Sequence, residues 1–141
     1  MASFLYNSGK VGLLNGTIDL LVDTIKVALV GAAYVANKDS HDFFNDITNE
    51  VSGNGYTAGG KVLSNAAISQ DSANDRAVFS AGDLVWPVAS FTARAAVIYK
   101  STGNAATSPL LAYVDFGANR TVTGQDFTIE WHQDGILYLG E

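Results

Sequence analysis

The clearest alternation of hydrophobic and polar positions lies in residues 91–100 and 110–116, on either side of a short loop of small and polar residues. Strand side chains point alternately to the two faces of a sheet, and in both runs each of the two faces carries apolar groups. A loop of this length suits an antiparallel hairpin and is too short for a helical crossover. The pattern therefore predicts a central antiparallel hairpin with a face covered by a second sheet or by a neighbouring subunit.

Shorter strand patterns precede and follow this hairpin. In residues 127–131 the alternation places Phe127, Ile129 and Trp131 on the inward face. Pro87 is predicted to end or kink its strand, because proline cannot donate a ladder hydrogen bond. Residues 117–125 are predicted to form a loop. The predicted strands outside the hairpin are residues 25–30, 61–69, 76–80, 84–86, 127–131 and 136–139.

One segment shows a helical pattern. Asp39 and Ser40 have side-chain oxygens that can accept hydrogen bonds from the free N–H groups at the start of a helix. The apolar residues that follow them recur at helical spacing and would form one stripe. They are Phe43, Phe44, Ile47 and Val51. This pattern predicts a short helix over residues 41–51.

Residues 1–15 form a separate N-terminal arm or short helix, whose pattern is neither cleanly helical nor cleanly alternating. It either packs on its own domain or docks on a neighbour, because chain termini are free to reach outward. Phe4, Leu5 and Tyr6 are the candidate docking residues, since they form an apolar run next to the terminus.

The chain has 141 residues, which suits one domain, and it has no cysteines. Seven or eight short strands with frequent turns and one or two short helices indicate a mainly β fold. We therefore expect residues 16–141 to form a single-domain antiparallel β-sandwich or barrel. The absence of cysteine excludes a disulfide framework, a thiolate zinc site and a cysteine nucleophile.

The formal net charge is −6, and the eight basic residues are spread along the chain. Nucleic-acid binding needs concentrated positive charge, and an acidic membrane surface would repel this protein. The sequence shows neither a signal peptide nor an apolar run of the ~20 residues that span a bilayer. We therefore expect a soluble protein made in the cytoplasm that binds neither nucleic acid nor membrane.

Three patterns in the sequence are formal candidates for sites of chemistry. Residues 53–58 match a dinucleotide fingerprint formally, but the expected order is helix, loop, strand, whereas that motif follows a strand and opens a helix. The acidic group around His41, which consists of Asp39, Asp42 and Asp46 together with the histidine, lacks the spacing of a calcium loop. Neither His41 nor His132 accompanies a recognisable nucleophile motif. The sequence therefore predicts no enzyme, no cofactor and no metal site.

Trp86 and Trp131 are the largest apolar side chains, and each lies on a strand pattern. Packing in the core is the simpler interpretation. Anchoring of an interface is the alternative, because tryptophan is common at binding hot spots.

Five segments together resemble small virion proteins from the structural-gene modules of tailed bacteriophages. The resemblance covers residues 13–137 and includes no catalytic signature. The segments are LLNGTIDLLVDTIKVALV, HDFFNDITNEVSGNGYTAGGKVL, NDRAVFSAGDLVW, FTARAAVIYKSTGNAATSPLLAYVDFG and FTIEWHQDGIL.

The resemblance is strongest to a capsid decoration, or cement, protein. It implies a β-rich protein on the outer surface of the virion head that binds the major capsid protein, bridges its subunits and assembles as a homotrimer. Phe4, Leu5 and Tyr6 would then contact the capsid or another subunit. The alternative is a tail, baseplate or fibre-associated protein that binds a host surface. Neither reading implies an active site.

Overall fold

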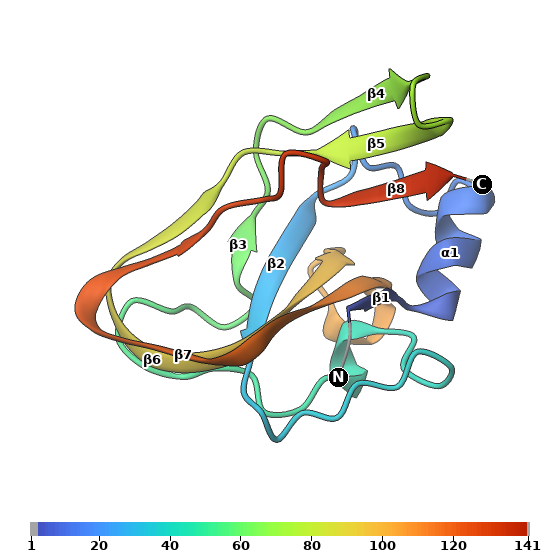
Figure 1. The fold of residues 1–141 in the computed structure, drawn as a ribbon. Coiled ribbons are helices and arrows are strands. Elements are labelled where there is room, and N and C mark those ends of the chain that lie inside the picture. The colour runs from blue at the N-terminus through green and yellow to red at the C-terminus, as the bar shows by residue number, and fades with distance from the viewer. Residues whose placement is uncertain (1–2, 141) are drawn as a thin grey trace.

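The computed structural model describes residues 3–140, which form two antiparallel sheets arranged as an open sandwich (Figure 1). The expected mainly β, antiparallel fold is confirmed, and it is sandwich-like and not a closed barrel. The sheets have the strand orders β1-β7-β6-β2-β3 and β4-β5-β8. The elements are β1 (Phe4–Leu5), α1 (Asn7–Leu14), β2 (Ile25–Val30), η1 (Phe44–Asp46), β3 (Lys61–Val62), β4 (Ala67–Asp71), β5 (Arg76–Ser80), β6 (Leu84–Lys100), η2 (Ala105–Thr107), β7 (Leu110–Ile129) and β8 (Leu137–Gly140).

The predicted central hairpin is confirmed as β6 and β7, which pair along almost their whole lengths. The prediction of a loop over residues 117–125 is wrong, because this segment continues β7. Its backbone pairs with the first half of β6, and the hydroxyls of Thr92 and Thr121 lie 2.8 Å apart across the pair. A polar segment shows little hydrophobic periodicity, so only its partner strand reveals it as a strand. The long ribbon curls, and its far end joins β5 and β8 (Figure 1).

The kink predicted at Pro87 is present, although the strand does not end there. The register of β6 against β7 slips between Trp86 and Ala89, and Val88 has a positive φ of 48°. Such an irregularity bends the strand locally and leaves an extra residue outside the ladder.

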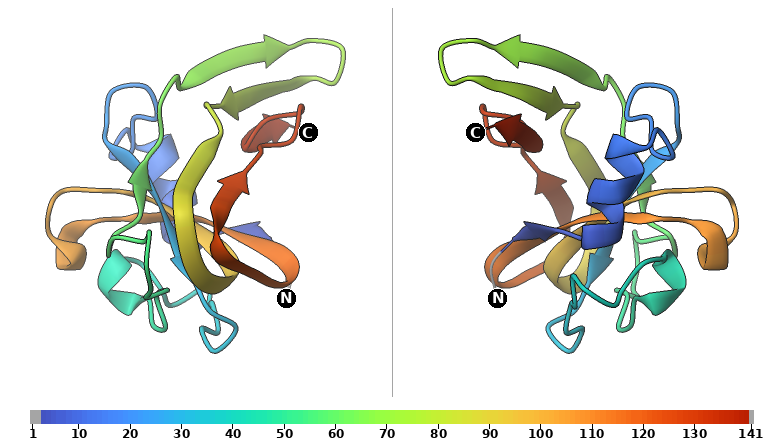
Figure 2. Two further views of the ribbon diagram at one scale, coloured as in Figure 1. Left: turned by 90° about the vertical axis from the view of Figure 1, so that its left-hand side faces the viewer. Right: turned by 90° about the vertical axis from the view of Figure 1, so that its right-hand side faces the viewer.

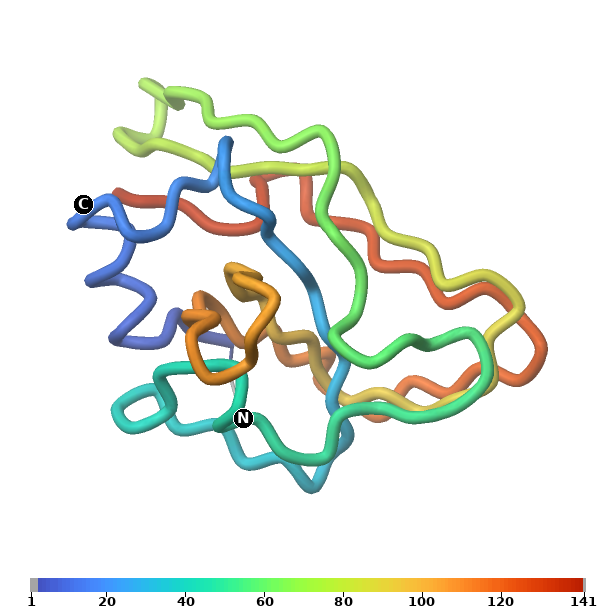
Figure 3. The backbone as a smooth tube through the Cα atoms, turned by 180° about the vertical axis from the view of Figure 1, so that it is seen from behind, coloured from blue at the N-terminus to red at the C-terminus, as the bar shows by residue number. Residues whose placement is uncertain are grey.

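Both faces of the five-stranded sheet are covered by the chain itself. One face forms the main core with the three-stranded sheet, where Trp86 and Phe79 are fully buried. Residues 31–47 cover the other face through Tyr34, Phe44 and Ile47, as the tube in Figure 3 lets the reader follow. The second cover is a loop, which explains why both faces of the central hairpin are apolar.

The helix predicted over residues 41–51 is wrong, and only the short turn η1 forms there. Asp39 and Ser40 do not cap a helix; their N–H groups donate to the side-chain oxygen of Asn37. Phe44 stacks on Tyr99 with ring centroids 4.1 Å apart, whereas Phe43 is exposed. The apolar residues therefore do not share one helical face, because they anchor an irregular loop on the sheet.

Two further segments contain more elements than the sequence pattern indicates. Residues 3–15 include the strand β1, which pairs with β7, and the helix α1, which also packs against β7. The strand predicted over residues 61–69 is divided into β3 and β4, and Asn65 between them has φ of 55°. This break lets the chain pass from the first sheet to the second (Figure 2).

Candidate binding groove

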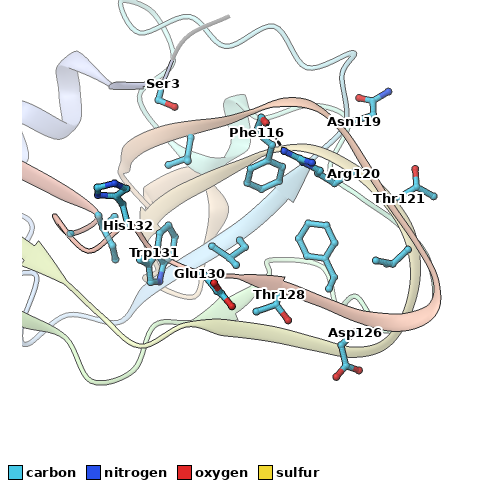
Figure 4. Close-up of a pocket in the computed structure, with 16 residues that line it drawn as sticks. Ser3, Phe116, Asn119, Arg120, Thr121, Asp126, Thr128, Glu130, Trp131 and His132 are labelled. Atoms are coloured by element: carbon cyan, nitrogen blue, oxygen red, sulfur yellow. Dashed lines mark hydrogen bonds between the residues drawn. The ribbon is translucent and has the colours of Figure 1, made fainter.

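A hollow of about 870 Å³ lies inside the curl of β7 (Figure 4). It exists because the bend of β7 brings residues 114–122 opposite residues 126–131. Its floor is made by half-buried or buried apolar side chains of Val114, Phe116, Val122, Phe127, Ile129, Trp131 and Ile136. We call this hollow and its continuation along the edge of the sandwich the binding groove.

The polar residues of the groove do not converge on one point. In Figure 4 Phe116 points into the hollow, whereas Asp126, Thr128 and Glu130 point away from it. Arg120 lies at the rim, and its guanidinium donates to the carbonyl oxygen of Phe116 over 3.4 Å. An apolar floor inside a polar rim is typical of a surface that binds apolar side chains of a partner.

Trp131 is held in place at one end of the groove. Its indole N–H donates to the carbonyl oxygen of Gly82 over 3.0 Å, and its backbone N–H donates to Asp83 over 3.1 Å. Trp86, by contrast, is fully buried in the core. The inward placement predicted for Phe127 and Ile129 is confirmed, whereas Trp131 is only half buried and partly lines the groove.

A second hollow of about 550 Å³ continues the groove between β1–β7 and β8. The two hollows share Ser3, Val114, His132, Gly135 and Ile136. β1 and β8 are edge strands of their sheets, so each leaves backbone N–H and C=O groups unpaired on one side. The groove therefore runs along the open side of the sandwich, between two strand edges that can bind an extended peptide.

The three candidate docking residues lie in and beside this second hollow. Phe4 and Leu5 line it and pair with Tyr113 and Ala112 of β7. Tyr6 is fully buried; its hydroxyl lies 2.9 Å from that of Tyr34, and burial raises the pKa of Tyr6 far above its usual range. Phe4 and Leu5 therefore lie where a partner could contact them, whereas Tyr6 packs inside its own domain. Docking by these residues stays a prediction.

The acidic group around His41 serves the loop that contains it. The carboxylate of Asp46 accepts hydrogen bonds from the backbone N–H groups of Asp42 and Phe43, and these bonds lower its pKa. Asp39 accepts a hydrogen bond from Asn7, and the Nδ1 atom of His41 lies 2.8 Å from the Tyr34 hydroxyl. Within residues 3–140 no group of three or more histidine and carboxylate side chains is placed to hold a metal ion.

The glycine-rich loop over residues 53–60 packs against the sheet. The carboxylate of Glu50 accepts hydrogen bonds from the hydroxyl of Tyr56 and the backbone N–H of Gly59. The hydroxyl of Tyr99 donates to the carbonyl oxygen of Gly59, and burial raises the pKa of Tyr99 to about 12. At Gly60, which has a positive φ, a Cβ atom would lie 1.9 Å from a backbone oxygen of β2. These glycines therefore permit close packing of the loop.

His132 lies in the hollow shared by the two parts of the groove, and its Nδ1 atom accepts a hydrogen bond from the backbone N–H of Asp134. This interaction is local to the turn before β8.

Sequence reasoning did not identify the groove. Phe116 and Val122 face the same hollow only because β7 curls between them, and the sequence around that curl reads as a loop. Gly117 and Gly124 lie in that segment and both have a positive φ, so these glycines are a sequence signal of a bend.

Comparisons with protein-family models, with curated proteins and with solved structures give no match to this chain. Among residues 3–140, no helix has the length and apolar character needed to cross a membrane.

Proposed function

We propose that this protein is a head decoration protein of a tailed bacteriophage. It binds the outside of the capsid as a homotrimer and stabilises the shell by bridging subunits of the major capsid protein. The binding groove is the surface that contacts the capsid. The observation that carries this assignment is the groove itself, which offers an apolar floor inside the curl of β7 and, in its continuation, the edge strands β1 and β8.

The sequence supports the proposal through the five segments that resemble phage virion proteins. The chemistry of the groove supports a binding role, since Asp126 and Glu130 point away from the hollow and leave an apolar surface for a partner (Figure 4). An extended segment of a capsid subunit would pair with an edge strand and place alternate side chains on the apolar floor.

A decoration protein does not need very tight individual contacts. The capsid presents many equivalent sites in a symmetric lattice, so modest interfaces of standard size add up over the whole shell. Separation of two capsid subunits must then also break the contacts of the protein that bridges them.

Quantitative mass spectrometry of purified virions tests this function. We expect a copy number near that of the major capsid protein, and loss of the gene should lower the temperature at which heads release DNA. Absence from the particle, or unchanged heat stability of heads without it, contradicts the proposal.

A second candidate function is a tail or fibre-associated protein that binds a host surface. Phe116 and Trp131 favour it, because half-buried aromatic rings that line an open groove can also stack on a ligand. This candidate predicts only a few to a few tens of copies in each particle.

A further inference from the structure

The helix α1 presents an unusual distribution of side chains. It buries Gly9 and Gly12, while Val11 and Leu14 are 59% and 84% exposed. A Cβ atom at Gly9 would lie 2.7 Å from the carbonyl oxygen of Leu110, so the glycine permits the close approach of α1 to β7. Surface helices normally turn their apolar side chains toward the core. Here the glycine face is buried, and an apolar face remains exposed.

An apolar cleft of about 360 Å³ lies beside the C-terminal end of α1. It separates the helix end and residues 16–20 from the three-stranded sheet, which includes β8. Its apolar lining consists of Leu13, Ile18, Leu20, Ile68, Ala77, Val78, Phe79, Leu137 and Leu139.

The cleft exists because the sheet extends beyond the core. Ile68, Phe79 and Leu137 are paired side by side across the three strands. Phe79 is fully buried, whereas Ile68 is 50% exposed at the edge of the same row, and Leu139 on the next row is 55% exposed. Residues on the inner face of this sheet are therefore left open to solvent.

The charges near the two surfaces are complementary. Lys10 lies on α1 next to the exposed Val11, and Asp19 lines the cleft. Asp19 is the one charged residue in the described lining of the cleft. For a chain of net charge −6, a second copy approaches most easily where carboxylates are few and a cation is present.

We propose that the exposed face of α1, formed by Lys10, Val11 and Leu14, docks into the apolar cleft of a second copy of this chain. Each copy carries both the helix face and the cleft, so the contact can form between identical chains. Leu14 fills the cleft against Ile68 and Leu139, and Lys10 lies near Asp19 of the second copy. A second copy is favoured over a different partner because this chain itself supplies both complementary surfaces.

Sedimentation equilibrium of the purified full chain tests the contact. We expect the wild type to be an oligomer and both Leu14→Glu and Leu139→Glu to be monomers. Val35→Glu is the matched control, because Val35 is equally apolar and 69% exposed but lies outside both surfaces, so this variant should remain oligomeric. A cooperative thermal unfolding transition in each variant is the control that the fold is retained.

Mixing the two monomeric variants provides the sharper test. Leu14→Glu keeps an intact cleft and Leu139→Glu keeps an intact helix face, so together they should form an equimolar complex. A monomeric wild type, an oligomer that neither substitution dissociates, or two monomeric variants that do not combine would each overturn the proposal. These measurements do not involve the capsid. A monomeric wild type would also contradict the homotrimer of the proposed function, whereas the contact with the capsid is tested separately by binding to isolated heads.

Discussion

At the scale of single residues, the ion pair between Arg94 and Asp115 joins the two strands of the central ribbon. The Nε atom of Arg94 lies 3.0 Å from the Oδ1 atom of Asp115, which also accepts a hydrogen bond from the backbone N–H of Gly117. Arg94 is the main cause that lowers the pKa of Asp115 to about 2, and the Gly117 bond adds to it. The pair therefore stabilises β7 just before its curl.

The pH dependence of stability follows from the sign of this shift. A carboxyl whose pKa is lower in the folded state contributes stability above its unfolded pKa of about 3.9, and this is lost as pH falls toward 2. We expect Asp115→Asn to lower the free energy of unfolding at pH 7 by about 1–2 kcal/mol. Urea unfolding between pH 7 and pH 2 should show the difference from wild type shrinking below about pH 4.

The double variant Arg94→Gln/Asp115→Asn is the control for this prediction. It removes both charges, so a double-mutant cycle isolates the pair from other effects of each substitution. A difference between wild type and Asp115→Asn that stays constant down to pH 2 would show that the ion pair does not lower the pKa.

At the scale of elements, the ribbon β6–β7 depends on local irregularities. Val88 follows Pro87, is 70% exposed and has φ of 48°, a conformation that β-branched residues rarely adopt. Its N–H donates to the side chain of Asp126 over 3.1 Å, which fixes the extra residue of the bulge. The bulge is therefore built at the cost of strain at Val88.

Replacing Val88 by asparagine should relieve this strain. Asparagine tolerates the left-handed region, so we expect Val88→Asn to raise the free energy of unfolding by about 1 kcal/mol. Val85→Asn is the matched control. Val85 is paired in the regular part of β6, so this substitution should lower the free energy of unfolding. Urea denaturation measures both, and a loss of stability in Val88→Asn would contradict this account of the bulge.

At the scale of the whole molecule, the sandwich is closed on one side and open on the other. Residues 31–47 cover the outer face of the five-stranded sheet. On the opposite side, the space between the edge strands β1 and β8 is not covered and forms part of the binding groove. The groove and the exposed face of α1 involve different residues, whereas the groove and the apolar cleft meet at Leu137 of β8.

A charge placed in the groove should prevent attachment to the capsid. We expect Phe116→Arg to weaken binding to isolated heads at least about tenfold, because it puts a cation on the apolar floor. Val62→Arg is the control, since Val62 is an exposed apolar residue on β3 away from the groove. Co-sedimentation with heads measures binding, and equal binding of Phe116→Arg and wild type would remove the groove from the capsid contact.

The sequence by itself determined the strands whose alternation is set by neighbouring residues. The central hairpin, the strand over residues 25–30 and the strand over residues 76–80 follow directly from their apolar pattern, because side-chain direction in a strand is a local property. The kink at Pro87 follows from the chemistry of one residue.

Only the tertiary structure decided where the polar half of β7 lies and that residues 41–51 form a loop. The first depends on pairing with β6, and the second depends on Phe44 stacking against Tyr99, a residue far away in the chain. The binding groove and the exposed apolar face of α1 have the same origin, because both arise from the way distant segments pack. A pattern along the chain records which residues are apolar, but the arrangement of the sheets decides which of them remain open to a partner.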